Sequence, residues 1–592
     1  MPVLDRRDLD FLLQDVLDLD ALFTRPRFAE HDRASVAAML DTAEKLADDH
    51  FAPHAAKLDA NEPTFDGETV HIIPEVKAAL DAYCAAGFMS AHADYEHGGM
   101  QLPHTVSMAS SAIISAANIS TAGYPFLTRA AANVIAKFGT AEQKATWLGA
   151  MLEGRYFGTM ALTEPGAGSG LADLKTQAVP ADDGTYRITG NKIFISAGEH
   201  GLSENIVHLV LARIKGAPAG VKGISLFIVP KILGDGTRND VRLAGLIHKM
   251  GYRGTTSTML NFGEGGGATG YLLGEAHKGL SYMFHMMNEA RVGVGLGAAV
   301  IGYAGYRVAL DYAKTRAQGR PPAAKDPSLP PVAIIEHADV KRMLLASKAY
   351  VEGALALCLL GARLVDDSET AESPEARNRA FQLLDLLTPM IKSWPSQWAL
   401  VANDLAIQVH GGYGYTREYP VERLWRDNRL NPIHEGTFGI QSLDLLGRKI
   451  FADQGKALAL LAEEMQKTIQ AAPPAFEEEA AALANAIALV SKTVAVLGRA
   501  AAGNQLDQAL ANSAVFLELL GHVVVAWLWL RKASVAEEKS AGATGDLAAF
   551  YDGKRRACRY FFRWELPKIR PQADLLQSLD QTCADMPIDA FG

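Results

Sequence analysis

The stretch MALTEPGAGS, residues 160–169, stands where the sequence changes from helical to strand-like. On its N-terminal side, from about Ser35 to Glu153, apolar residues recur at helical spacing, and Gly and Pro lie mainly at the breaks. From about Tyr156 to Gly274, short β-branched runs separated by turns replace that spacing. Because no long helical pattern separates these runs, we expect a helical domain followed by an antiparallel sheet.

Helical periodicity returns at residue 279 and continues to about Lys449, broken once by a proline-rich loop at 319–335. The remainder of the chain is alanine-rich and also reads as helical. The sequence therefore predicts an α+β multidomain protein. We expect an N-terminal α-helical domain (1–157), a middle antiparallel β-barrel or sandwich domain (158–275), a C-terminal four-helix bundle (276–451) and an additional C-terminal α-helical domain (452–592).

Composition and charge exclude several classes of protein. The chain has 592 residues, of which 49% are apolar and 21% charged, and its formal net charge of −10 argues against a nucleic-acid partner. The four cysteines lie far apart and form no CxxC pair, so we expect neither a metal site nor a disulfide framework, and a reducing cytoplasmic location.

The N-terminus lacks the basic, apolar and small-residue pattern of a signal peptide. The longest apolar run, residues 514–530, carries Glu518 and His522, so we expect no membrane-spanning segment.

Three glycine-rich or polar segments interrupt the regular pattern. In residues 160–169, Thr163 and Ser169 offer hydroxyls, and the glycines expose backbone N–H groups that suit a planar or phosphorylated ligand. Phe194 and Ser196 place an aromatic ring and a hydroxyl two residues apart on one predicted strand. Residues 408–420, QVHGGYGYTREYP, form a further break between helices. Taken singly, each segment also fits an ordinary loop or strand.

The segment GVGLGA, residues 293–298, satisfies the glycine pattern of dinucleotide-binding folds. It follows a helical run and not a strand, so its glycines cannot form the phosphate-binding turn. We expect these small residues to allow close packing of helices.

The segment HEGTFGIQ, residues 434–441, admits two interpretations. In the first, Gly436 relaxes a turn, Thr437 caps the next helix, and Glu435 lies near the positive end of that helix. In the second, the glycine lets a flat ligand approach the backbone and Glu435 is a catalytic base.

In combination and in this order, these motifs resemble the acyl-CoA dehydrogenase family over roughly residues 35 to 450. The added C-terminal domain resembles that of the longer bacterial branch, which includes methylthiopropionyl-CoA dehydrogenases. The resemblance implies FAD as cofactor. The implied cofactor-binding residues are Met160, Leu162, Thr163, Ser169, Phe194, Ser196, Arg316, Gln408, Gly411, Gly412, Thr437 and Gln441. The implied substrate-binding residues are Ser169, Asn288, Arg291, His434 and Gly436.

The resemblance also implies that Glu435 removes the α proton of an acyl-CoA thioester while the β hydrogen leaves as hydride to the flavin. Burial between flavin and acyl chain should raise the pKa of this carboxyl group. Some family members take the base from the position before the arginine that matches Arg291. That position is Ala290 here, and Glu289, about 100° round the helix, is a weaker candidate. His434 stands where relatives commonly have Tyr, and Gly319 where many have an aromatic residue.

The resemblance further implies electron-transfer flavoprotein as partner and a homodimer, because Arg316 matches an arginine that reaches the FAD of a neighbouring subunit. Three alternatives stay open: an acyl-CoA oxidase, a non-redox relative acting on a sulfur-containing thioester, and a helical scaffold or membrane adaptor. The segment 554–564, KRRACRYFFRW, fits either a membrane-surface helix or a packing helix with Tyr560 and Trp564 facing the core. We expect the packing helix and no membrane contact.

Overall fold

The computed structural model describes residues 4–323, 326 and 328–592, apart from the side chains of residues 284–289. The described chain forms two compact units, one made of Arg27–Gly293 and the other of residues 4–26 together with Val294–Gly592. The long helix α10 (Gly279–Thr315) runs from the first unit into the second along the chain.

The first unit begins with helices. Its helix α3 starts at a capping box. The Asp32 side chain accepts from the backbone N–H of Ser35, and the Ser35 hydroxyl oxygen accepts from the backbone N–H of Asp32. Asn118 ends one helix and caps the next, because its side chain accepts from Thr121 N–H. The α-helices are α3 (Arg33–Leu46), α4 (Ala55–Ala60), α5 (Pro74–Ala85), α6 (His104–Ala117), α7 (Ile119–Phe138), α8 (Ala141–Gln143) and α9 (Gly149–Leu152), with a two-stranded ribbon of β1 (Thr64–Phe65) and β2 (Val70–His71).

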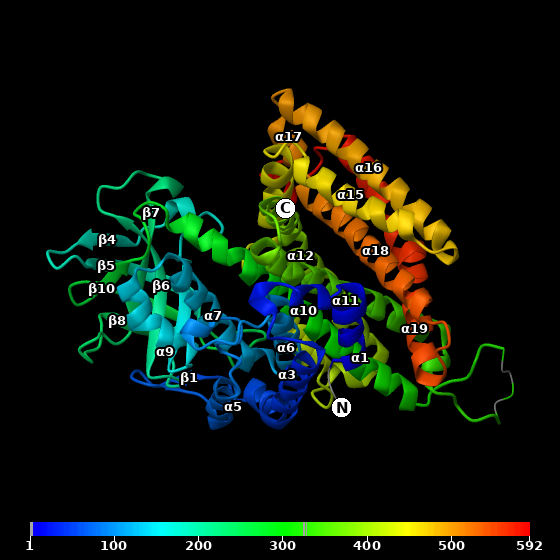
Figure 1. Cartoon of the computed structure of the whole chain (residues 1–592), viewed down its shortest axis with the longest axis horizontal. Coiled ribbons are helices and arrows are strands. Elements are labelled where there is room, and N and C mark those ends of the chain that lie inside the picture. The colour runs from blue at the N-terminus through cyan, green and yellow to red at the C-terminus, as the bar shows by residue number, and fades with distance from the viewer. Residues whose placement is uncertain (1–3, 324–325, 327) are drawn as a thin grey trace. The chain divides into compact units, whose positions relative to one another are not determined.

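A closed sheet follows in the same unit (Figure 1). Its strands run in the order β10-β7-β6-β4-β5-β9-β8, and β10 also pairs with β5, which closes the sheet into a barrel. Most pairings are antiparallel, as expected, but β3 and β4 both pair with β6 in parallel, so the sheet is mixed. The strands are β3 (Tyr156–Ala161), β4 (Gln177–Pro180), β5 (Tyr186–Ser196), β6 (Asn205–Ile214), β7 (Ile224–Pro230), β8 (Val241–Leu246), β9 (Ser257–Phe262) and β10 (Ala268–Leu272).

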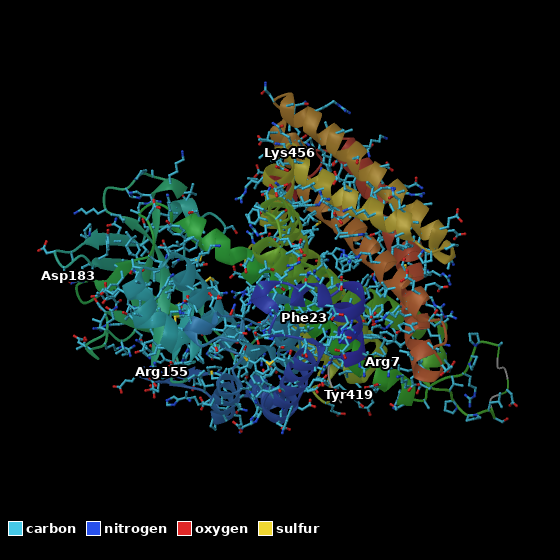
Figure 2. All side chains as sticks on the ribbon, in the orientation of Figure 1. Arg7, Phe23, Arg155, Asp183, Tyr419 and Lys456 are labelled. Atoms are coloured by element: carbon cyan, nitrogen blue, oxygen red, sulfur yellow. The ribbon has the colours of Figure 1, made fainter. Side chains whose placement is uncertain are left out.

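Apolar side chains from several strands fill the barrel. Ile188, Val210, Phe227 and Val229 are fully buried in one cluster, which explains why β6 and β7 read as nearly continuous apolar runs. The β4–β5 turn carries Asp183, which points away from the sheet (Figure 2) and accepts from Thr185. The sheet thus forms a rigid base for the loops at its ends.

The second unit contains a helical bundle made of the C-terminal part of α10 with α11 (Ala338–Thr370), α12 (Pro374–His410), α13 (Val421–Asn428) and α14 (Phe438–Leu443). Gly295 lies against α12, since a Cβ at this position would meet the carbonyl oxygen of Ile391 at 2.0 Å. Gly302 likewise faces Ala399. The glycines of 293–298 lie within a helix, and Gly295 serves close helix packing, as the sequence predicts.

The C-terminal helices belong to the same unit: α15 (Lys456–Ala471), α16 (Glu477–Ala502), α17 (Leu506–Leu510), α18 (Ser513–Lys539), α19 (Gly545–Tyr560) and α20 (Ile569–Gln577). Helices α15, α16 and α18 lie alongside one another (Figure 1). Helix α18 is buried on most sides, and its Trp529 donates to the carbonyl of Ala349 in α11 at 3.0 Å. The C-terminal extension, residues 452–592, is therefore packed on the bundle.

The first helices of the chain, α1 (Arg6–Asp10) and α2 (Asp20–Phe23), cluster with this second unit. We expected residues 1–157 to form one N-terminal domain. Residues 4–26 instead cluster with the helices of the second unit. The physical reason is a buried ion pair between Asp8 and Lys554 of α19, with a further hydrogen bond from Arg531 to Val16.

Four described helical segments are long and apolar enough to cross a membrane: Ala290–Thr315, Ala338–Thr370, Pro474–Ala502 and Ser513–Lys539. They meet this criterion by length and composition only, so the expectation that no segment spans a membrane stays a prediction. Within the protein, 83%, 89%, 33% and 83% of these segments' most apolar windows are buried. Packing inside the fold accounts for three of the four.

Candidate active site

The loop after β3 is fixed to strand β5 by a buried ion pair. Lys192, buried on β5, donates to Glu164 at 3.0 Å and to the carbonyl of Leu162 at 2.9 Å. Glu164 also accepts from the backbone N–H groups of Lys175 and Thr176 and from the Thr176 hydroxyl. The MALTEPGAGS loop is thus anchored from below, with Ser169 exposed and Thr163 partly exposed.

These contacts shift both pKa values. Burial lowers the pKa of Lys192 to about 8, although the carboxylate beside it acts in the opposite direction. Burial acts to raise the pKa of Glu164, yet the Lys192 charge and the three hydrogen bonds lower it below its usual value. At neutral pH we therefore expect the pair to be ionised.

Strand β5 presents Phe194 and Ser196 on its exposed side, with Ile195 buried between them. The pairing of β5 with β9 shifts register between Lys192 and Ile195, and Phe194 has a φ of +60°. This bulge was not predicted, and it leaves the phenyl ring 61% exposed. An exposed ring held by a strained backbone suits stacking against a flat ligand.

Other predicted residues of the first unit lie near these elements or along α10. Met160 is the second-last residue of strand β3, and Leu162 directly follows the strand. The side chains of Met160 and Leu162 are partly buried. Arg291 is 4% exposed on α10. The side chains of Asn288 and of Glu289, the alternative base, lie outside the described residues.

In the second unit, Arg316 and the glycine-rich break at 408–420 lie together. Arg316 directly follows α10, and its guanidinium lies 5.8 Å from the ring centroid of Tyr413. Arg316, Gln408, Gly411 and Gly412 are all exposed in the single chain. Gly411 has a φ of +60°, which favours glycine, and a Cβ there would meet nothing within 4 Å.

Aromatic rings support this surface from beneath. Tyr312 stacks on His410 with ring centroids 4.3 Å apart, and Tyr419 (Figure 2) lies edge-on to Tyr312 at 5.3 Å. Since Tyr312 belongs to α10 and His410 to α12, the stack fixes the two helix ends that carry Arg316 and Gly411. A cation beside exposed backbone N–H groups is an arrangement that suits a phosphate or pyrophosphate.

Glu435 lies in the short loop between α13 and α14 with a φ of +54°, and Gly436 follows with a φ of +94°. Gln441 donates to the carbonyl of Glu435 at 2.9 Å. A Cβ at position 436 would meet the Gln441 amide nitrogen at 2.7 Å. The positive φ therefore favours glycine here, and a larger residue would also displace the Gln441 amide from the Glu435 carbonyl.

Thr437 occupies the N-cap position of α14, but its side chain makes no capping hydrogen bond. The first interpretation of HEGTFGIQ, in which Thr437 is a simple cap, is therefore incomplete. The Oε1 atom of Gln441 is buried and has no hydrogen-bond partner among the described residues. A buried acceptor and a hydroxyl not used for capping fit the polar atoms of a cofactor such as FAD.

His434, just before Glu435, is reached by a chain of buried asparagines. Asn403 donates to the carbonyl of Ile301, Asn428 donates to Asn403, and Asn431 donates to Asn428. These directions leave Asn431 Oδ1 as the acceptor facing His434 Nε2 at 3.1 Å, so the imidazole proton is on Nε2. Burial, with the nearby charge of Lys392, lowers the pKa of His434 to about 3, so the ring is neutral.

Sequence reasoning missed Lys392 as well as these asparagines. Its ammonium is fully buried and donates to the carbonyl of Gly436 at 2.7 Å. Neither Lys392 nor the asparagines belong to a recognisable pattern, because single polar residues within helices are ordinary in a sequence.

The basic segment 554–564 is largely neutralised within the second unit. Lys554 is buried between Asp8 and Glu352, and Arg555 pairs with Glu537 and Asp552. Arg556 and Arg563 also have carboxylate neighbours. Tyr560 is buried as expected, but Trp564 is 57% exposed and stacks on Tyr560, because a π-helical turn at Phe561–Glu565 alters the spacing. Most of the segment packs on the fold.

Among the residues that the structure describes, no three His, Cys, Asp or Glu side chains are grouped to hold a metal ion.

Four family models match consecutive parts of the chain. "Acyl-CoA dehydrogenase, N-terminal domain" matches residues 34–155, and the corresponding middle domain matches 159–264. "Acyl-CoA dehydrogenase, C-terminal domain" matches 277–450, and "Acetyl-CoA dehydrogenase C-terminal like" matches 461–587. The matches follow the order of elements seen in the structure.

Named relatives and solved structures agree. The chain is 38% identical to the 3-methylmercaptopropionyl-CoA dehydrogenase of Ruegeria pomeroyi, covering 93% of each. It is 36% identical to the broad-specificity linear acyl-CoA dehydrogenase FadE5 of Mycobacterium tuberculosis, covering 99% of each. A Bacillus anthracis acyl-CoA dehydrogenase complexed with FAD has the same fold, with a TM-score of 0.74 at 22% identity over 96% of this chain and 91% of that one. The chain therefore belongs to the acyl-CoA dehydrogenase family, whose members are FAD enzymes, and carries the family's additional C-terminal helical domain.

Proposed function

We propose that this acyl-CoA dehydrogenase converts an acyl-CoA thioester into the trans-2-enoyl-CoA, with Glu435 as the base. The Glu435 carboxylate removes the proton from the carbon α to the thioester carbonyl, and a C=C bond forms as the β hydrogen departs with its electron pair. FAD, when bound, supplies the acceptor for that hydride. The backbone N–H of Glu435 is the donor that we assign to the thioester carbonyl, where negative charge develops.

The observation that carries this proposal is the backbone at Glu435. A glutamate with a φ of +54° is sparsely populated and costs on the order of 1–3 kcal/mol unless the surroundings hold it. Here the conformation of Glu435 is held by the hydrogen bond from Gln441 to its carbonyl. Gly436 leaves room for that hydrogen bond, because a Cβ at position 436 would meet the Gln441 amide. Stored strain at an acidic side chain, beside a neutral His434, is typical of a functional carboxylate.

The residues that we assign to FAD fall into two sets. In the first unit, Phe194 and Ser196 would contact the flavin ring, and Thr163 and Ser169 the cofactor or the coenzyme A phosphates. In the second, Arg316, Gln408, Gly411 and Gly412 form the surface for the pyrophosphate, and Thr437 and Gln441 the contacts beside Glu435. The exposed Arg316 surface supports a homodimer, in which it meets the cofactor of the neighbouring subunit.

We propose electron-transfer flavoprotein as the electron acceptor and the cytoplasm as the location. The named relatives are dehydrogenases, which supports this acceptor over molecular oxygen. Ion pairing of most cations in 554–564 within the fold supports a protein that does not bind membranes through this segment.

The substrate is tested by anaerobic bleaching of the flavin with a panel of thioesters: linear short and long, branched, aromatic and methylthio acyl-CoA. The names of the two relatives favour a methylthio or linear acyl chain. Bleaching by none of these thioesters would contradict the proposed reaction. Stoichiometric hydrogen peroxide under air would identify an oxidase instead.

A further inference from the structure

Lys392 contacts the catalytic loop from within the bundle. It lies on α12, its side chain is 0% exposed, and its Nζ donates to the carbonyl oxygen of Gly436 at 2.7 Å. Three other described lysines, Lys192, Lys532 and Lys554, are as deeply buried. Burying an ammonium is costly, so each contact that Lys392 makes matters for the parts it joins, and one of these contacts is with the catalytic loop.

This contact and a second one hold two successive carbonyl groups of the loop. Gln441 donates to the carbonyl of Glu435 at 2.9 Å, and Lys392 donates to the carbonyl of Gly436 at 2.7 Å. Both residues of the loop have positive φ, +54° and +94°. Because each carbonyl oxygen lies in a planar peptide group, fixing two in succession fixes the orientation of both peptide planes. These two planes flank Gly436, and the first of them is also the peptide plane that follows Glu435, so the two hydrogen bonds restrict the backbone on the C-terminal side of the carboxylate.

The two donors differ in strength and origin. A hydrogen bond from an ammonium is about twice as strong as one between neutral groups. Lys392 also comes from a long helix that packs against α11 along its length, whereas Gln441 lies on a helix of six residues. The lysine therefore connects the catalytic loop to a long helix that packs against α11.

We propose that Lys392 is a positioning residue for Glu435, holding the Gly436 carbonyl so that the strained loop aims the carboxylate at the α carbon. This inference rests on the proposed role of Glu435. Lys392 itself takes no proton and touches no substrate. Its removal leaves the carboxylate in place but lets its direction vary.

The test uses the full-length flavin-loaded protein with Lys392→Met, and Lys532→Met as the control. The control removes another fully buried ammonium, 3.4 Å from Glu352, without touching the catalytic loop. Flavin reduction is followed anaerobically with the thioester that bleaches the wild-type flavin fastest, in protonated and α-dideuterated forms. Thermal unfolding and thioester affinity are measured for each variant.

We expect Lys392→Met to reduce the flavin about 10- to 100-fold more slowly, as misplacement of a catalytic group by about 1 Å does, with thioester affinity within about threefold. The isotope effect from α-deuteration should rise, because proton removal becomes more rate-limiting. Lys532→Met should unfold at lower temperature but keep the wild-type rate and isotope effect. A purely structural Lys392 would behave like this control, and that result would overturn the proposal.

Two further variants keep every outcome interpretable. If methionine at 392 prevents folding, Lys392→Leu, which also lacks a donor, takes its place, and a wild-type rate and isotope effect in that variant overturn the proposal equally. Glu435→Gln is measured in parallel. Near-normal reduction in Glu435→Gln refutes the assigned base, whereas loss of reduction there with normal reduction in the Lys392 variants refutes only the positioning role.

Discussion

Lys554 of the C-terminal extension forms a buried ion pair with Asp8, a residue 546 positions earlier in the chain. Both side chains are 1% exposed, and the same ammonium lies 2.6 Å from Glu352 of α11. One cation thus joins the N-terminal segment, the bundle and the extension. Because a buried carboxylate without its partner is strongly unfavourable, the three parts depend on one another.

We predict that Lys554→Met lowers the free energy of unfolding by about 3–5 kcal/mol, because it leaves Asp8 and Glu352 with less compensation. Arg556→Ala, on the same helix, is the matched control: Arg556 is 72% exposed and pairs with Asp552 at the surface. That change should cost no more than about 1 kcal/mol. Equal losses of unfolding free energy in the two variants, measured by chemical denaturation, would contradict a larger contribution from the buried pair.

Arg316→Ala should weaken FAD retention and loosen the oligomer together, since one guanidinium is assigned to a pyrophosphate across a subunit boundary. Flavin content and gel-filtration volume are the measurements. Arg320→Ala, on the following loop, serves as a control in which both should stay normal. Loss of flavin with an unchanged oligomer would contradict the shared-site picture.

Glu164→Gln should destabilise the first unit and weaken flavin binding, because Lys192 loses its buried counter-charge. The pKa of Glu164 is lowered in the folded state, so the carboxylate's stabilisation is present above its unfolded value of 4.5 and is lost as the pH falls below it. The difference in unfolding free energy between wild type and variant should therefore shrink between about pH 5 and pH 3. A difference independent of pH would contradict the ionised pair.

Deleting residues after Phe451 should cause aggregation, because α18 covers the bundle through groups such as Trp529, which donates to Ala349. The exposed bundle surface would include the apolar faces of α11 and α12. The intact protein should remain unbound to anionic vesicles at physiological salt. Flotation of the intact protein with such vesicles would favour a membrane-surface enzyme and would identify α16, the least buried apolar helix, as the region to examine.

Much of the fold follows from sequence periodicity. The change from helical to alternating pattern at about Tyr156 coincides with the first residue of β3, and the helical return at residue 279 coincides with the start of α10. The N-terminal helices could not be assigned in the same way. What places residues 4–26 with the extension is the pairing of Asp8 with Lys554, and periodicity carries no information about contacts at such separation.

Site residues that belong to a sequence motif could be predicted. Single residues that contact the site from neighbouring helices could not. Phe194 and Ser196 emerge on the exposed side of β5, yet the bulge that turns Phe194 outward depends on register with β9. Lys392 and Asn428 become recognisable only when the fold brings their side chains to the loop of Glu435 and His434. Supporting residues of this kind leave no spacing in the sequence to detect.

The most direct test of the account is anaerobic flavin reduction by Glu435→Gln. The amide keeps the size of the side chain but cannot accept the α proton, so flavin and thioester binding should persist while reduction slows by at least about 1,000-fold. Glu289→Gln, measured beside it, should stay within about tenfold of wild type. Reduction by Glu435→Gln within about tenfold of the wild-type rate would contradict the central claim and move the base elsewhere.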